Sequence, residues 1–329
     1  MLCRKGERAM NKATKAWLII AASLILIGGV LFTGVMSVLN WDFSKLSTST
    51  YETNRHEINE AFEAISIHTD TADVVFVPSG SGDCSIVCHE LKNAGHSVTV
   101  EDGTLIIKAM DTRKWYEHIG VNFGAPKITV YLPEAEYASL QINESTGDVE
   151  IPNNFQFESI DITVSTGDVK CATSATGAVR ISASTGDIYA WYMSAGSLSL
   201  STSTGDITVS SVICDNDLSV RVTTGNANLK DVSCKSLTSG GSTGDISLHN
   251  VTVAEKLSIN RSTGDVKLDA SDAAELFIET DTGDVEGSLL TDKIFITKTD
   301  TGRVSVPVSV EGGRCEITTN TGDIKITVK

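Results

Sequence analysis

Hydrophobic positions in the C-terminal half of the chain recur in a fixed relation to a Thr-Gly pair. Seven and five residues before each glycine the side chain is mostly Leu, Ile or Val, and after the glycine the apolar residues stand at the second and fourth positions. Alternation on each side predicts two half-buried strands per unit. The change of parity predicts that the chain turns at the Thr-Gly pair.

The glycines are 19 or 20 residues apart, at Gly147, Gly167, Gly186, Gly205, Gly225, Gly244, Gly264, Gly283, Gly302 and Gly322. A unit of this length cannot bury its own apolar face, so neighbouring units must stack to form a core. The pattern therefore predicts an all-β fold, a parallel β-helix or β-solenoid with 19–20-residue coils. We expect right-handed coils, because parallel crossovers are almost always right-handed.

Proline and glycine indicate further bends within each coil. Pro152 and Pro307 both stand five residues after their glycine, where the second strand should stop because proline cannot donate to a ladder. Gly177, Gly196 and Gly312 stand ten residues after theirs and indicate another corner. The pattern leaves open whether a coil has two or three strands.

The segment before the regular coils also contains strand signals. Residues 64–77 match the repeat if Ala72 takes the place of the glycine, and residues 97–108 read as a hairpin around Glu101-Asp102-Gly103. We expect residues 57–138 to form an N-terminal cap with atypical rungs, which hides the terminal edge. Residues 139–329 would then form the regular solenoid of ten Thr-Gly-Asp coils.

Residues 16–39 are an uncharged apolar run that is long enough to cross about 30 Å of hydrocarbon as one helix. The basic residues near it all lie in residues 1–15, so the positive-inside rule predicts a cytoplasmic flank, a transmembrane signal anchor and an extracytoplasmic C-terminal domain. A cleaved signal peptide is the alternative. Residues 40–56, rich in Ser and Thr, read as a stalk.

The composition narrows the class of partner. The net charge is −16 and aromatic residues make up 6% of the chain. Such an acidic chain should repel nucleic acid, and no basic groove is evident. We expect the partners to be the membrane, through the single-pass anchor, and an envelope protein or a surface polysaccharide.

The repeated tetrapeptide has a structural and a functional interpretation. Glycine takes a positive φ, and Asp accepts backbone N–H bonds around the bend. A column of carboxylates could instead attract Ca²⁺, although Asn226 and Arg303 interrupt it. We predict a turn-forming role, and no resident metal or cofactor, for Gly147, Asp148, Gly167, Asp168, Gly186, Asp187, Gly205, Asp206, Gly244, Asp245, Gly264, Asp265, Gly283, Asp284, Gly322 and Asp323.

Two cysteines hold the same place in adjacent coils. Cys214 and Cys234 both stand nine residues after their glycine, and Val253 and Ala273 follow in that column. Because these two following residues are apolar, we predict that the column lies in the core and that cysteine acts there as a small hydrophobic side chain. A disulfide between the two cysteines is the alternative.

Exposed apolar residues are the candidate binding positions. Tyr189 and Trp191 should point outward from one coil, where they could stack on sugar rings or contact a protein. Phe277, Ile294 and Ile296 break the outer polar pattern further on and form a second candidate patch. The alternative interpretation is that loops or the N-terminal cap cover these residues.

Enzymatic chemistry finds little support in the residues. The six histidines are scattered, and the chain has no nucleophile elbow, paired-histidine metal motif or phosphate loop. We therefore predict no catalytic residues and no enzymatic activity. A β-helix enzyme that acts on polysaccharides is the alternative, but Arg180, Arg221 and Arg261 do not form the basic cluster that it would need.

Several motifs together resemble a known family. They are Thr-Asp-Thr-Ala-Asp-Val (69–74), Val-Glu-Asp-Gly-Thr-Leu (100–105), Ile-Thr-Val-Tyr-Leu-Pro (128–133) and the serial Ser-Thr-Gly-Asp-Val. Over residues 60–329 this combination resembles the bacterial putative-adhesin family of β-strand-repeat cell-envelope proteins. The resemblance implies a parallel β-helix on the cell envelope and supplies no catalytic residues.

Two hypotheses on function follow. The first is a membrane-anchored, extracytoplasmic, non-enzymatic protein with an adhesin-like binding or scaffold role. The second is a regulatory or structural envelope component that acts on a membrane protein or assembles end to end. Lys325 and Lys329 on the final strand argue against end-to-end assembly, because edge lysines discourage strand pairing.

Overall fold

The computed structural model describes residues 12–42, 50–80, 82–115 and 124–329. It divides into two units, one of residues 1–50 and 113–124 and the other of residues 51–112 and 125–329. Most of the predicted basic flank and the middle of the predicted stalk lie outside the described residues.

The first unit contains one helix, α1 (Lys12–Val38). Within it, Ala13–Val38 has a mean hydropathy of 2.5 and is long and apolar enough to cross a membrane. The hydroxyl of Thr33 donates to the carbonyl of Gly29 at 2.9 Å, so it does not present a free donor to its surroundings. The apolar helix predicted from the sequence is therefore present.

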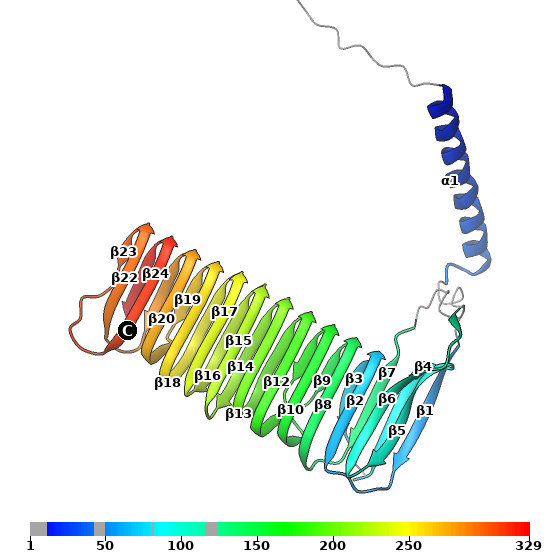
Figure 1. Ribbon diagram of the computed structural model, residues 1–329, viewed down its shortest axis with the longest axis horizontal. Helices are drawn as coiled ribbons and strands as arrows, with labels where there is room; N and C mark the ends of the chain where they lie inside the picture. Colours follow the sequence, from blue (N-terminus) through cyan, green and yellow to red (C-terminus); the bar gives the residue numbers. More distant parts are fainter. Residues whose placement is uncertain (1–11, 43–49, 81, 116–123) are drawn as a thin grey trace, which may run out of the picture. The chain divides into compact units, whose positions relative to one another are not determined.

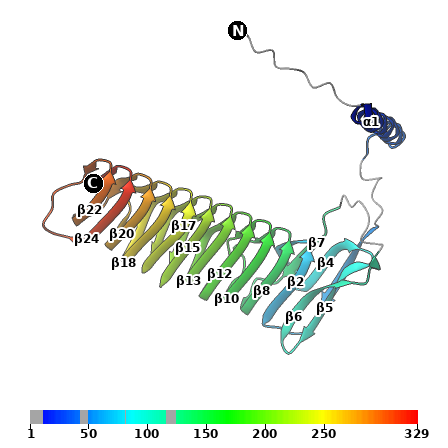
Figure 2. The same ribbon diagram turned by 45° about the horizontal axis from the view of Figure 1, so that its top comes forward.

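The second unit is a β-solenoid of about ten turns, which confirms the predicted fold class. Strands that precede the bends stack in parallel as one row (Figures 1 and 2). In spatial order these are β2 (Ala64–Thr71), β8 (Glu136–Thr146), β10 (Gln156–Thr166), β12 (Ser174–Thr185), the end of β13 (Ile188–Thr204), β15 (Asp217–Thr224), β17 (Ser236–Thr243), the end of β18 (Ile246–Thr263), β20 (Asp272–Thr282), β24 (Gly313–Thr321) and β22 (Lys293–Thr301).

Strands that follow the bends stack in a second parallel row. They are β3 (Asp73–Pro78), β9 (Val149–Ile151), β11 (Val169–Cys171), the start of β13, β14 (Ile207–Cys214), β16 (Ala227–Cys234), the start of β18, β19 (Val266–Asp269), β21 (Val285–Leu289), β25 (Ile324–Val328) and β23 (Val304–Ser305). The two rows enclose the apolar side chains that alternate toward the inside, such as Ile181, Leu200 and Ile207, which are almost fully buried.

In the regular coils the bend between the rows requires glycine, as Gly205 illustrates. Gly205 has a φ of 136°, and a Cβ added there would lie 2.2 Å from the carbonyl oxygen of Gly186 in the preceding coil. Both the backbone angle and the approach of the neighbouring coil exclude a side chain. The strands β9 and β23 also end before Pro152 and Pro307, as expected.

The second corner differs from the expected one. In five consecutive coils it lies six residues after the glycine, at non-glycine residues with φ between 48° and 56°: Tyr192, Ser211, Asp231, Asn250 and Ala270. Gly177 and Gly196 instead lie inside β12 and β13. They are needed because the coils approach closely, since a Cβ on Gly177 would lie 2.7 Å from the carbonyl oxygen of Glu158. After the corner a third short ladder pairs Val212 with its neighbours in the middle coils.

The coils do not stack in sequence order at the C-terminal end. β24 pairs with β20 on one side and with β22 on the other, and β25 likewise lies between β21 and β23. The last coil in the sequence thus lies between the coil of β20 and β21 and the coil of β22 and β23, which precedes it in the sequence (Figure 1). The edge is formed by β22 and β23, whereas β25 has a strand on each side. The expectation that Lys325 and Lys329 lie on an open final strand is therefore wrong.

The N-terminal end shows a similar insertion. β6 (Thr104–Asp111) and β7 (Lys127–Leu132) pair in parallel with the outer sides of β2 and β3. Antiparallel strands β1 (Tyr51–Ile58), β4 (Cys84–Leu91) and β5 (Ala94–Glu101) complete this end. The predicted hairpin is confirmed, because Glu101 pairs with Thr104 and both Asp102 and Gly103 have positive φ.

β1 begins inside the segment that we expected to be a stalk. Its inward positions hold Glu52, Asn54 and His56 rather than aliphatic residues. The alternation of apolar and polar residues that marks a strand is therefore absent from this segment. Its pairing with β4 over eight residues makes it a strand.

Candidate functional site

The Asp residues of the tetrapeptide form a continuous ladder from coil to coil. The backbone N–H of Asp168 donates to Oδ1 of Asp148 at 2.8 Å, and that of Asp187 donates to Oδ1 of Asp168 at 2.8 Å. The same bond recurs along the column, beginning at Asp73. One carboxylate oxygen per residue is thus engaged by the next coil, which supports the turn-forming role.

The two departures from Asp fit this ladder. Asn226 accepts the N–H of Asp245 through its own side-chain oxygen at 3.0 Å. Arg303 donates its N–H to Oδ1 of Asp323 at 2.8 Å, and because its coil is the outermost one, no later coil needs an acceptor from it. A basic residue is tolerated there because of the altered stacking order.

The predicted aromatic pair lies on the side of the solenoid. The rings of Tyr189 and Trp191 meet edge to face at 6.3 Å, and the Tyr189 hydroxyl donates to Asp187 at 3.1 Å. Both are half-buried, whereas Tyr192 at the adjoining corner is exposed. Sequence reasoning missed Tyr192, because only the positive φ at this corner turns it outward.

The second predicted patch is not continuous. Phe277 lies on β20 with the ammonium of Lys256 4.5 Å from its ring centre, while Ile294 and Ile296 lie on β22. In the register of the ladder, Glu316 of β24 stands between Phe277 and Ile296. The insertion of β24 therefore separates residues that the sequence suggested were one patch.

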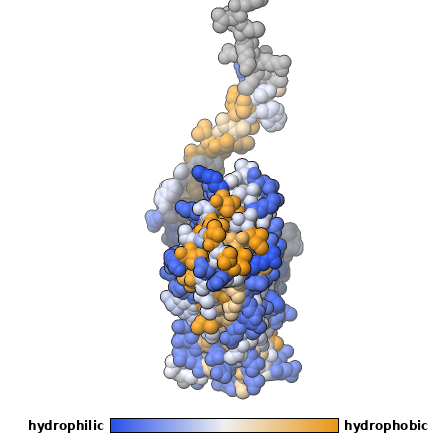
Figure 3. Space-filling view, turned by 90° about the vertical axis from the view of Figure 1, so that its left-hand side faces the viewer, coloured by the Kyte–Doolittle hydropathy of each residue, from blue (hydrophilic) through white to orange (hydrophobic). Residues whose placement is uncertain are grey.

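The C-terminal end face combines exposed apolar side chains with an unpaired strand edge. We use this name for Ile294, Ile296, Val304, Val308 and Val310, which are 43 to 100% exposed. Among the described residues, β22 pairs only with β24 and β23 only with β25. Seen from this end, hydrophobic side chains gather in the middle of the face with polar residues around them (Figure 3).

The three valines were not singled out from the sequence. Val304 stands two residues after its glycine, a position that is fully buried in the other coils, for example at Val285 and Ile324. It is 44% exposed because its coil is the last in the stack. The sequence carried no signal for this, since the repeat places the coil next to last.

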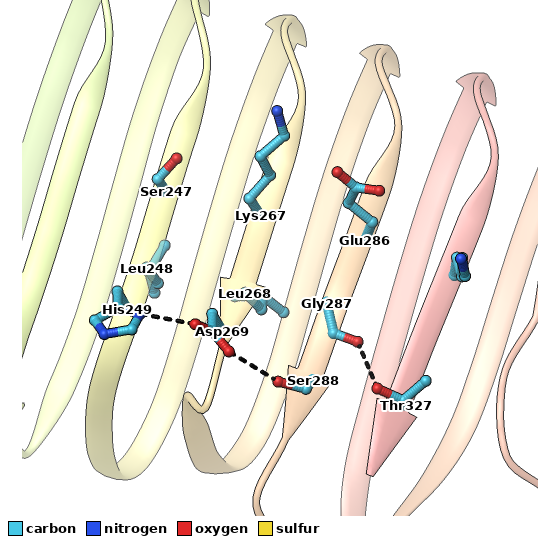
Figure 4. A pocket seen from close by; sticks show the side chains of 11 residues that line it. Ser247, Leu248, His249, Lys267, Leu268, Asp269, Glu286, Gly287, Ser288 and Thr327 are labelled. Carbon is cyan, nitrogen blue, oxygen red and sulfur yellow. Dashed lines mark hydrogen bonds and ion pairs between the residues drawn. The ribbon is translucent and has the colours of Figure 1, made fainter. Parts of the chain in front are cut away.

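A shallow groove of about 540 Å³ runs across four coils of the second row. Its outward side chains form two lines, one with Lys267, Glu286 and Lys325 and the other with His249, Asp269, Ser288 and Thr327 (Figure 4). Charges of both signs alternate along the first line. The groove could accept a polar segment of a partner but has no charge that selects an anion or a cation.

Asp269 in this groove is already engaged by its neighbours. It accepts from Lys329 Nζ at 2.9 Å and Ser288 at 3.3 Å, and its other oxygen lies 2.8 Å from His249 Nδ1. The hydrogen bond from Lys329, followed by that from His249, lowers the pKa of this carboxyl below its usual value. A carboxylate that is ionised and held in this way is a poor general acid.

Glu144 and Arg261 are ionisable side chains that are buried and have polar atoms without a hydrogen-bond partner. Glu144 accepts the backbone N–H of Ala72 at 3.1 Å, but its other oxygen has no partner; burial, and then the charges of Asp73 and Asp148, raise its pKa to about 8. Arg261 donates to the carbonyl of Val222 at 3.3 Å, while Nε and Nη2 have no partner. Burial lowers the pKa of Arg261.

The cysteine column is part of the core. Cys214 and Cys234 are buried and free, so the disulfide alternative is not present. Burial raises the pKa of Cys234 to about 12, which keeps this thiol protonated and unreactive.

Comparisons with solved structures return proteins of similar length at low identity. A "putative adhesin" from Bacteroides fragilis NCTC 9343 is 13% identical with a TM-score of 0.42, covering 85% of this chain and 97% of that one. A second "putative adhesin", from Parabacteroides distasonis ATCC 8503, is 13% identical with a TM-score of 0.47, covering 84% and 98%. A "putative lipid binding protein" from the same strain is 18% identical with a TM-score of 0.46, covering 85% and 98%.

Comparison with family models is more decisive. No curated protein is significantly similar to the chain. The model of the toastrack DUF4097 family matches residues 62–327, which is most of the chain and the whole run of coils. The ladder of Thr-Gly-Asp bends and the solenoid that it holds together thus place this chain in the toastrack DUF4097 family.

Proposed function

We propose that this protein is a non-enzymatic scaffold of the cell envelope that is anchored by α1 and binds another envelope protein through its C-terminal end face. The exposed apolar side chains on the unpaired edge of the last coil carry this proposal. A solenoid suits such a role, because its rigid stack presents a fixed surface at its end.

A protein partner fits this face better than a small molecule does. An unpaired parallel edge offers a row of backbone donors and acceptors that another strand can complete, and the isoleucines and valines offer apolar area beside it. Grouped exposed hydrophobic side chains on a polar protein mark interaction sites. We therefore expect a partner that contributes a strand or an apolar segment.

The anchor and its orientation rest on the N-terminal sequence. α1 is long and apolar enough to span a membrane, and the basic residues Arg4, Lys5 and Arg8 precede it. Under the positive-inside rule these residues stay in the cytoplasm and the solenoid lies outside. The adhesin-like role implied by the family resemblance requires this orientation.

Site-specific photo-crosslinking of the full chain in the cells that produce it tests the proposal. A photoreactive residue at position 296 or 308 would report on the end face. The same residue at position 213 is the matched control, because Ile213 is an aliphatic residue that is 61% exposed on the side of the solenoid. We expect a discrete crosslinked protein from the first two positions and none from the third.

Val308→Asp should abolish the crosslink from position 296, and Ile296→Glu should abolish the crosslink from position 308, while the thermal unfolding temperature stays unchanged. Crosslinking of equal strength from position 213 would refute the end face as the binding surface. A crosslinked product with the mass of two chains would instead identify self-association end to end.

Glycan binding is the second candidate, and the exposed ring of Tyr192 beside Tyr189 and Trp191 favours it. Aromatic faces on a polar surface stack on sugar rings. Retention of the full chain on cell-wall polysaccharide, lost in Tyr192→Ala and kept in Ile296→Glu, would support this role in place of the first.

A further inference from the structure

The N-terminal end of the solenoid contains three buried side chains of different metal-ligand types. Cys88 and Glu90 lie two residues apart on the inner face of β4, and His96 lies on β5, which follows β4 after a short turn. They are 0, 3 and 9% exposed. Their sulfur, carboxylate and imidazole donor atoms all lie within 4.8 Å of one another.

Neighbouring residues form hydrogen bonds to two of the three ligands, Glu90 and His96. Asn54 Nδ2 donates to Oε1 of Glu90 at 2.8 Å, and the hydroxyl of Thr69 lies 2.9 Å from Nε2 of His96. These contacts leave Oε2 of Glu90 and Nδ1 of His96 facing each other at 2.8 Å. Outer hydrogen bonds of this kind orient the ligands in metal sites.

Among the described residues, neither a lysine nor an arginine pairs with the buried carboxylate of Glu90. Among the ion pairs of the described residues, Glu90 pairs only with His96. Burial of a carboxylate is costly unless it is paired or bound to a metal. A neutral His96 would leave that charge without a counterion.

A fourth side chain near the cluster also lacks a partner. Nε2 of His56 is buried without a hydrogen bond. His56 lies on the inner face of β1, two residues from Asn54, which is paired with Cys88 in the ladder. An imidazole nitrogen is a common metal ligand, but Nε2 of His56 is not among the donor atoms that lie within 4.8 Å of one another.

We propose that Cys88, Glu90 and His96 bind a divalent transition-metal ion, and that Zn²⁺ is the ion that suits them. A thiolate, an imidazole and a carboxylate are the ligand types of zinc sites, whereas Ca²⁺ and Mg²⁺ prefer oxygen ligands alone. The fourth position of a tetrahedral ion falls to a water molecule.

Binding changes the position of a proton on two of the ligands, Cys88 and His96. A cysteine binds zinc as a thiolate, so Cys88 must give up its proton. Zn²⁺ displaces that proton to solvent and forms the Zn–S bond. His96 then binds through the lone pair of Nδ1 and donates its Nε2–H to the Thr69 hydroxyl.

The site would join four strands of the end that precedes the regular coils. Cys88 and Glu90 belong to β4, His96 to β5, and the outer partners Asn54 and Thr69 to β1 and β2. These strands pair partly in antiparallel fashion and lack the Thr-Gly-Asp ladder. A bound metal would therefore stabilise the end that the repeat itself does not stabilise.

The test uses the full chain in detergent, freed of metal with a chelator and then given Zn²⁺ or Co²⁺ alone. We expect one Zn²⁺ per chain after desalting by elemental analysis, a higher thermal unfolding temperature, and a thiolate-to-metal charge-transfer band with Co²⁺. Cys88→Ser should lose the band, and His96→Asn should bind at least tenfold more weakly.

Cys84→Ser is the matched control, because Cys84 is also a buried cysteine on β4 and lies outside the cluster. It should keep the charge-transfer band and the metal content. Absence of bound Zn²⁺ in the wild-type chain, or a band that survives in Cys88→Ser, would overturn the proposal. If Cys88→Ser fails to fold, the wild-type spectrum and the Cys84→Ser spectrum still decide it.

Discussion

At the residue scale, the same interior column holds very different side chains in successive coils. Three residues before the glycine stand Glu144, Val164, Gly241 and Arg261, all facing inward. Gly241 makes room for Arg261, because a Cβ there would lie 2.1 Å from Nη1 of that arginine. The repeat therefore constrains the bend and the aliphatic columns more strongly than it constrains this position.

Gly205→Ala should destabilise the solenoid by about 3 kcal/mol or more, because the added Cβ meets the Gly186 carbonyl at a φ that disfavours side chains. Denaturant unfolding measures this. Gly80→Ala is the control: its Cβ would have nothing within 4 Å, so we expect a change within about 0.5 kcal/mol. Equal effects would contradict the stacking argument.

Glu144→Gln should remove a pH dependence of stability. The pKa of Glu144 is raised from 4.5 to about 8 in the folded protein, so folding favours the protonated form. Its contribution is complete below pH 4.5 and is lost as the pH rises through about 8, at roughly 1.4 kcal/mol per unit.

The amide variant keeps an acceptor for the N–H of Ala72 and carries no charge. We therefore expect wild type and variant to unfold at similar temperatures near pH 4.5 and the variant to be the more stable above pH 8. Parallel pH profiles for the two proteins would show that Glu144 is not desolvated in solution.

Arg261→Met should stabilise the protein by about 1 kcal/mol or more. The substitution removes a buried cation with two unpartnered nitrogens and keeps an unbranched apolar chain in the space beside Gly241. Thermal unfolding measures the effect. Arg221→Met, two coils earlier, is the control, since Arg221 is exposed and should change stability by less than about 0.5 kcal/mol. A loss of stability in Arg261→Met would indicate an internal partner for the guanidinium.

At the element scale, the insertion of the last coil decides which strands are central and which are at the edge. β24 has neighbours on both sides, whereas β22 has one. The insertion also explains why Arg303 replaces Asp and why Ile294 and Ile296 remain exposed. The edge position of β22, the arginine at position 303 and the two exposed isoleucines all follow from this stacking order.

Hydrogen exchange should reveal this order directly. Residues 313–321 are closer to the C-terminus than residues 293–301, yet their amides lie between two paired strands. We expect slower exchange in 313–321 than in 293–301, as measured by mass spectrometry of peptides from the intact chain. Faster exchange in the later segment would contradict the inserted arrangement.

At the scale of the whole molecule, the chain consists of an apolar helix and an acidic solenoid whose contacts are mostly internal. Each coil contributes inward side chains to one continuous core, so stability depends on neighbours along the stack. The two ends are therefore where the structure departs from the repeat. They are also where the apolar end face and the buried ligand cluster lie.

A fragment of residues 51–329 should fold and remain soluble without detergent, because it contains the whole solenoid and lacks α1. We expect its circular dichroism to show the β-sheet signal of the intact chain and one cooperative unfolding transition. Partition of the full chain into detergent, and of the fragment into buffer, would be the corresponding readout for the helix. Aggregation of the fragment that Ile296→Glu does not relieve would argue against an independent solenoid.

The sequence by itself determined the solenoid, its Thr-Gly bend and its apolar helix, because the constraints behind them act within one coil or between identical coils. The parity change around Gly167, the positive φ it needs and the Asp168 acceptor are all local and repeated. The hairpin at Asp102-Gly103 is equally local.

Only the tertiary structure decided what happens where the repeat ends. The order of β20, β24 and β22 is set by contacts between coils, and no local pattern records that order. The gathering of Cys88, Glu90 and His96 depends on a turn between two antiparallel strands that lie outside the period. The Thr-Gly-Asp period specifies neighbours within the stack, whereas the exposed edge and the buried cluster arise from contacts that the period does not specify.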